Sequence, residues 1–273
     1  MKPAMSIDHL VPRAVSGEKD ALHQLIEAIR DRIYGMSVRM LGHPEDAEEA
    51  TQEILIRVIT HLGSFRAESS FMTWAYRIAT NYLLSTRQSR AERPGRTFER
   101  FGADIERGVA ASLHFHAVQV DRVLRNEIRL SCTHSMLLCL SREERMAFIL
   151  GGIFELSGDE ASTLLDIPAA TFRKRLSRAR ERLQTFMRAQ CGVFDASNAC
   201  RCDKQGKVAK GSGQLTPEQH RFAPLPVEGG GLAADEAREF SDLLDVAKVI
   251  GTQPSYATPP QIIALLDQII NQP

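Results

Sequence analysis

The chain has 273 residues, is 43% hydrophobic, and carries 34 basic and 34 acidic side chains, so its formal net charge is zero. This composition is ordinary for a soluble globular protein, and zero net charge argues against bulk attraction to nucleic acid. Five cysteines, an odd number over a long chain, do not indicate a disulfide scaffold. Without an N-terminal signal pattern or a run of about 20 apolar residues, we expect a cytoplasmic protein with no membrane insertion.

The first ninety residues show the apolar periodicity of helices, at steps of three and four residues. One apolar stripe runs over residues 22–40, and a second helix opens at Pro44, which suits a first helical turn. The loop SFRAESS then leads to a third helix that begins near Ser69 or Ser70. We therefore predict an N-terminal helical bundle over residues 1–91.

Residues 92–117 have the composition of a linker between domains. They hold Pro94, Gly95, Gly102 and Gly108 among many charges, with little periodicity. We therefore predict a flexible linker in this segment.

Helical periodicity resumes in a second domain, residues 118–190. Ser141 with Glu144, and Ser157 with Glu160, have the spacing of capping boxes, in which a hydroxyl and a carboxylate satisfy free amides at a helix start. Alternation typical of strands is scarce throughout the chain. The predicted fold class is therefore all-α, with two helical domains and a small helical C-terminal extension.

A strongly basic helix lies near the end of the second domain. The stretch ATFRKRLSRARERL, residues 170–183, holds six Arg or Lys against the single acid Glu181. On a helical wheel its apolar stripe runs from Phe172 to Phe186, which leaves a cationic arc exposed. An isolated basic run is more often a solvated face, but a short helix and a turn at Asp166 precede this one. Together they have helix-turn-helix spacing, which favours binding in a DNA major groove.

With these residues in view, the chain closely resembles the extracytoplasmic-function (ECF) sigma factors of bacterial RNA polymerase over roughly residues 18–190. Four blocks in the order and spacing of that family carry the resemblance: DAEEATQEILIRV (46–58), FRAESSFMTWAYRIATN (65–81), LSREERMAFIL (140–150) and LSGDEASTLLDIPAATFRKRLSRARERL (156–183). The C-terminal CGVFDASNACRC resembles a tail found in one subset of the family. The resemblance implies a sigma factor that binds core RNA polymerase and directs promoter-specific transcription initiation, with no enzymatic activity of its own.

The resemblance also implies three binding surfaces. The first block would dock on the β′ clamp helices of the polymerase. The outward side of this helix is Asp46, Glu49, Gln52, Glu53 and Arg57. The β flap is a further polymerase contact that the resemblance implies. The second block would recognise and melt the minus-10 element, with candidates Phe65, Arg66, Ser69, Ser70, Thr73, Arg77 and Asn81. We place the single tryptophan, Trp74, in the core rather than on DNA. The fourth block would read the minus-35 duplex through Thr171, Arg173, Lys174 and Arg178. The resemblance also admits an anti-sigma factor as a partner.

Two other functions compete with this one. A helix-turn-helix regulator that does not join the polymerase would have no use for the acidic first block or for a melting surface. A thiol or zinc redox-sensing protein would use Cys191, Cys200 and Cys202, with His220 as a weak fourth ligand for structural zinc. An ordinary reduced segment remains the third interpretation of these cysteines. We expect no other cofactor, because the sequence has no phosphate-binding loop or catalytic motif.

The segment 191–273 ends in two short amphipathic helices, predicted over residues 240–250 and 260–270. Each is too apolar on one side to stand alone in water, so each must bury its stripe against something. We hypothesise that they fold back on one of the DNA-binding domains and restrain promoter binding. Structural support for the helix-turn-helix domain is the alternative.

Overall fold

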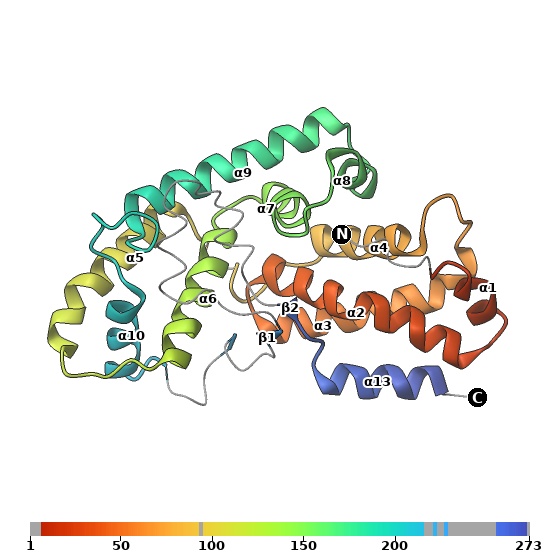
Figure 1. Ribbon diagram of the computed structural model, residues 1–273, viewed down its shortest axis with the longest axis horizontal. Helices are drawn as coiled ribbons and strands as arrows, with labels where there is room; N and C mark the ends of the chain where they lie inside the picture. The colour runs from red at the N-terminus through yellow and green to blue at the C-terminus, as the bar shows by residue number, and fades with distance from the viewer. Residues whose placement is uncertain (1–6, 93–94, 216–220, 223–226, 229–254, 272–273) are drawn as a thin grey trace.

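The computed structural model describes residues 7–92, 95–215, 221–222, 227–228 and 255–271 (Figure 1). The helices of the N-terminal half are α1 (Leu10–Val15), α2 (Lys19–Leu41), α3 (Pro44–His61), the 3-10 turn η1 (Leu62–Ser64) and α4 (Phe71–Ser85). The C-terminal half holds α6 (Arg122–Leu138), α7 (Arg142–Phe148), the π-turn η3 (Ile149–Ile153), α8 (Gly158–Leu165) and α9 (Ala169–Gln190). Within the described ranges the only strands are the two-residue segments β1 (Val227–Glu228) and β2 (Ser255–Tyr256). The remaining elements are helices, so the all-α prediction is confirmed.

The N-terminal bundle follows its apolar pattern. Gly42 ends α2 in the left-handed conformation (φ 64°), where its amide donates to the Val38 carbonyl at 2.8 Å. Pro44 occupies the first turn of α3, and the Ser70 hydroxyl caps α4 by accepting from the Thr73 amide. The predicted helix starts at Pro44 and beside Ser70 are therefore confirmed. The fully buried side chains of this bundle include Leu25, Ile29, Ile33, Ile54, Leu55, Val58 and Phe71.

The segment between the halves is predicted from its composition to be a flexible linker with little periodicity, yet residues 98–115 are helical. It forms α5 (Phe98–Ala111) and the 3-10 turn η2 (Ser112–Phe115), and the Thr97 side chain caps α5. Phe98, Phe101 and Ile105 pack into the core cluster that also holds Phe186 of α9. These aromatic contacts outweigh the glycines that made the segment look like a linker.

The helix-turn-helix forms as predicted. Ser157 and Glu160 make a complete capping box at α8, whereas Glu144 at α7 instead pairs with Arg182, so that box is only half formed. The turn into α9 is made by Asp166 in the left-handed conformation, with φ 51° and ψ 48°. Asp is among the few non-glycine residues that adopt it readily. The turn between α8 and α9 therefore forms without a glycine.

The two halves pack against each other. A single apolar cluster contains residues of α2 and α4 together with residues of α7, η3, α8 and α9. In Figure 1, α7 and α8 lie directly above α4, which agrees with the contacts between these helices. The two halves are therefore in direct contact in the described part of the chain.

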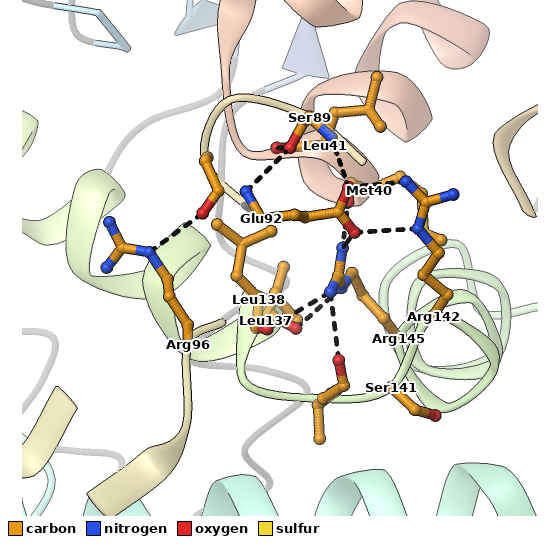
Figure 2. A network of polar contacts seen from close by, with 12 residues as sticks. Met40, Leu41, Ser89, Glu92, Arg96, Leu137, Leu138, Ser141, Arg142 and Arg145 are labelled. Atoms are coloured by element: carbon orange, nitrogen blue, oxygen red, sulfur yellow. Dashed lines mark hydrogen bonds and ion pairs between the residues drawn. The ribbon is translucent and has the colours of Figure 1, made fainter. Parts of the chain in front are cut away.

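A buried ionic network joins the halves around Glu92 (Figure 2). The Glu92 carboxylate accepts from Arg142 Nη2 at 2.7 Å and from Arg145 Nη1 at 2.9 Å. Arg145 is 2% exposed, and it also donates to the carbonyls of Met40 in α2 and of Leu137 at the end of α6. One guanidinium therefore contacts both halves at once.

Burial alone would raise the pKa of Glu92, but the hydrogen bonds from Arg142 and the Ser89 amide and the charge of Arg145 outweigh it and lower its pKa to about 2. The carboxylate is consequently ionised at neutral pH. Ser89 adds a further tie to α2, because its hydroxyl donates to the Leu41 carbonyl at 2.7 Å. The junction is held by charge-assisted hydrogen bonds, which are the stronger kind.

The C-terminal extension returns to the body at several places. Its helix α10 (Cys202–Gly211) packs against α5, η2 and α6, and its last helix, α13 (Pro260–Asn271), packs along α2 and α3. The predicted helix at 260–270 is confirmed. The other predicted tail helix, at 240–250, lies outside the described residues.

Candidate functional site

The exposed face of α9 is cationic, as predicted. Arg173, Lys174 and Arg178 are exposed, Thr171 near the helix start is half-buried, and Phe172 beneath them is 1% exposed. The buried stripe holds the helix in place while the basic side chains stay in water. All four predicted minus-35 residues therefore lie on α9, with the three basic ones open to solvent.

Two more arginines of α9 have partners inside the protein. Arg182 donates to Glu144 of α7 at 2.7 Å, and Arg180 donates to the Gly151 carbonyl at 3.5 Å. Arg175 is half-buried. The exposed basic residues Arg173, Lys174 and Arg178 therefore lie on the first three turns of α9, the end of a major-groove helix that contacts base edges.

On the outward face of α3, some side chains have partners within the protein and others are exposed to solvent. Asp46 accepts from the Arg90 amide and guanidinium, at 2.7 Å and 2.8 Å, and its side chain is 14% exposed. Glu53 pairs with Arg57 at 2.9 Å, and Arg57 lies over the Tyr82 ring of α4 at 4.7 Å. Two further side chains of the predicted set lie on this helix, Glu49 exposed and Gln52 half-buried.

The loop before α4 and the start of α4 bring the predicted minus-10 residues together. The Phe65 ring stands edge-on to Trp74, with ring centroids 5.7 Å apart, and Trp74 lies 6.0 Å from Phe71. Trp74 is half-buried and packs against the core, as the sequence pattern indicates. Three further members of the predicted set, Arg66, Ser70 and Asn81, are exposed, and two, Ser69 and Thr73, are half-buried.

Arg77 differs from the rest of that set because it faces the other half of the protein. Its Nη2 donates to the Thr163 carbonyl of α8 at 3.4 Å, and its Nε is buried without a hydrogen-bond partner. The helix that should contact the minus-10 element is therefore partly covered by α8. Only the three-dimensional packing reveals this contact, since residues 77 and 163 are far apart in the sequence.

Cys191, Cys200 and Cys202 lie near the end of α9, and Cys132 of α6 lies near them. Cys191 and Cys200 pair through a β-bridge, and the Gly192 amide donates to the Cys200 carbonyl at 3.2 Å. Burial raises the pKa of Cys132 well above its usual value, and the nearby thiols of Cys191, Cys202 and Cys200 raise it further. Cys132, on α6, therefore belongs to this group.

The part of the chain that the structure describes contains no preformed ligand set for the structural zinc considered above. There, no three His, Cys, Asp or Glu side chains are arranged to hold a metal ion. Burial, reinforced by Cys191 and Cys200, raises the pKa of Cys202 to about 11. The suggested fourth ligand, His220, lies outside the described residues.

The geometry defines a class of protein. A short helix, a left-handed turn and a long helix with an open cationic face form a helix-turn-helix DNA-binding unit, packed on a second bundle with an acidic helix. In the described ranges, no helix is both long and apolar enough to cross a membrane.

Comparison with known proteins identifies the family. Residues 25–93 match the Sigma-70 region 2 family model, and residues 130–183 match the model for Sigma-70 region 4. The ECF RNA polymerase sigma factor SigW of Bacillus subtilis (strain 168) is 31% identical over 189 residues, which cover 67% of this chain and 98% of that protein. The RNA polymerase sigma-H factor of Pseudomonas aeruginosa is 31% identical over 173 residues, covering 63% of this chain and 89% of that protein.

A solved structure, that of CnrH in complex with the cytosolic domain of CnrY, covers 68% of this chain and 99% of that chain, with 22% identity and a TM-score of 0.49. The sequence matches are decisive on their own. This chain belongs to the ECF sigma factors, and it is an RNA polymerase sigma factor, a transcription initiation factor.

Proposed function

We propose that this sigma factor docks on core RNA polymerase through the outward face of α3, contacts the minus-10 element with the segment 65–81, and reads the minus-35 duplex with α9. The segregation of charge carries the proposal: a neutral chain presents a cationic face on α9 and a mostly acidic face on α3. Opposite charges on separate helices suit two different partners, DNA and a basic protein surface.

In this proposal the sigma factor and the polymerase have different roles. The sigma factor supplies recognition in the cytoplasm, and the polymerase supplies the chemistry, so no cofactor is required of this chain. The division into domains at residues 91 and 118, with an extension from residue 191, stays a prediction. An anti-sigma factor likewise stays a predicted partner.

Glu49 offers the cleanest test of docking, because it is exposed and Asp46 is engaged with Arg90. Glu49→Lys should weaken co-elution with bacterial core polymerase and reduce transcripts from a genomic template. Glu143→Lys makes the same charge change at an exposed position of α7 and should leave both unchanged. Equal binding and equal transcription by the two variants would contradict docking through α3.

The minus-35 surface has its own test in DNA binding. An alanine at a base-reading residue should cost about 1–3 kcal/mol and relax specificity at one position, whereas an alanine at a phosphate contact should weaken all sequences alike. We expect Arg173→Ala or Lys174→Ala to show the first pattern in a binding assay against single-base variants of the promoter. If every alanine on α9 leaves promoter affinity intact, α9 is not the reading helix.

A further inference from the structure

The proposed function requires the minus-10 and minus-35 surfaces to lie farther apart than they do in the structure. The minus-35 and minus-10 elements are centred about 25 base pairs apart, which is ~85 Å along B-DNA at ~3.4 Å per base pair. In the structure Arg77 touches Thr163, and the eight residues from Thr163 to Thr171 span at most about 28 Å even when fully extended. The two DNA surfaces are therefore far too close to reach both elements, and the halves must separate.

One side chain of the C-terminal extension contacts both halves at their junction. Tyr256 in β2 is 1% exposed, and its ring lies 4.9 Å from the Arg39 guanidinium of α2. Its hydroxyl is hydrogen-bonded to Nε2 of His134 in α6 at 2.9 Å. Arg39 lies in the region 2 match and His134 in the region 4 match, so Tyr256 bridges the two regions.

A second stretch of the extension reinforces this bridge on the α6 side. The amides of Arg221 and Phe222 donate to the buried Glu127 carboxylate at 3.0 Å and 2.8 Å, and the Phe222 ring stacks on His134 with centroids 4.3 Å apart. β1 and β2 pair antiparallel, with Val227 opposite Tyr256. The bridge therefore belongs to an ordered substructure with contacts on both sides.

From this bridge the chain continues along the face formed by α2 and α3. The Thr258 amide and hydroxyl donate to Asp31 of α2, at 2.9 Å and 2.7 Å. Helix α13 then buries Ile262, Leu266 and Ile270, which are spaced four residues apart and join the main apolar cluster. The apolar stripe of the tail helix is thus satisfied by the N-terminal half.

Polar contacts along α13 fix its direction. Gln261 donates to Glu48 of α3 at 2.8 Å, and Lys19 at the start of α2 donates to the Asn271 carbonyl at 3.0 Å. Glu48 neighbours the exposed Glu49 of the proposed docking surface. The helix therefore lies against one edge of the α3 face that the polymerase would approach.

We infer that residues 255–271 form an intramolecular clasp, which holds the two sigma regions together and borders the docking face of α3, so that polymerase and promoter binding require its release. This inference rests on the proposed function. It refines the tail hypothesis: the described tail helix folds back on the N-terminal half rather than on the helix-turn-helix. The occupant of the α2 and α3 face is the chain's own C-terminus.

The test compares two variants of the full chain. Leu266→Asp places a charge in the buried stripe of α13, and Gln268→Asp places the same charge on its exposed side. For the wild type and Gln268→Asp, small-angle scattering should give a radius of gyration near the ~19 Å of a compact chain of this length. Leu266→Asp should increase this radius by several ångström and strengthen binding to core polymerase about tenfold or more.

A synthetic peptide of residues 255–271, added in excess to Leu266→Asp, should restore the compact radius and weaken polymerase binding again. This arm separates release of the clasp from unfolding, because a peptide cannot rescue an unfolded chain. A radius and a polymerase affinity equal to those of the wild type would overturn the clasp, as would an enlarged radius that the peptide leaves unchanged. Failure of the wild type and both variants to bind polymerase would instead overturn the proposed function, and the scattering would still test the clasp.

Discussion

Glu92→Gln should be among the most destabilising single substitutions in the chain. The change keeps the shape of the side chain but removes the charge that Arg142 and Arg145 share. The pKa of Glu92 falls from 4.5 to about 2, a difference of about 2.5 units, and at ~1.36 kcal/mol per unit this is about 3 kcal/mol of stability at neutral pH. Measured losses when one partner of a buried pair is removed are of the same size, about 3–5 kcal/mol.

The sign of the pH dependence follows from the direction of the shift. A lowered pKa means that the contribution is fully present above the unfolded value near 4.5 and is lost as pH falls toward 2. The stability gap between the wild type and Glu92→Gln should therefore be widest above pH 5 and close almost completely near pH 2.

Urea unfolding followed by circular dichroism at several pH values measures this gap. Glu143→Gln, at an exposed position, is the matched control and should change the unfolding free energy by less than about 0.5 kcal/mol. A gap below about 1 kcal/mol at pH 7, or one that stays constant down to pH 2, would refute the argument that Glu92 is held ionised by the two arginines.

Three further predictions concern single positions. Ser157→Ala should lower the unfolding free energy by about 1 kcal/mol in urea melts, because it removes the hydroxyl of the only complete capping box among the described helices. Asp166→Val should lower it by about 1–2 kcal/mol, since a β-branched residue is strained at φ 51°, whereas Asp166→Gly should not lower it. Cys202, with its pKa raised to about 11, should react with iodoacetamide at pH 7.5 far more slowly in the folded than in the urea-unfolded chain, as followed by mass spectrometry.

The helices that the sequence predicted well are those whose signals are local. The start of α3 at Pro44 and the cap of α4 at Ser70 depend on neighbouring residues only. Local signals do not predict α5, because Gly102 and Gly108 favour a break in the helical pattern. The spacing of Phe98, Phe101 and Ile105, at steps of three and four, was the signal that could have found it.

The missed features of the candidate site depend on contacts between distant segments. The sequence places Arg77 among the minus-10 residues, and nothing near it indicates that the Thr163 carbonyl accepts its hydrogen bond. Arg145 reads as an ordinary exposed charge in a polar helix, yet it is 2% exposed because Glu92 and three-dimensional packing provide its partners. Contacts between distant segments decide which polar residues are buried, and a local sequence pattern does not contain this information.

The junction and the clasp act on the same equilibrium between a closed and an open sigma factor. If the closed form is favoured by about 3 kcal/mol, only about one molecule in 150 is open, and a partner that binds the open form alone is weakened by the same factor. Releasing α13 raises that fraction without changing any residue that touches polymerase or DNA. Its effect on affinity must therefore level off once most molecules are open, whereas a substitution in the docking surface has no such ceiling.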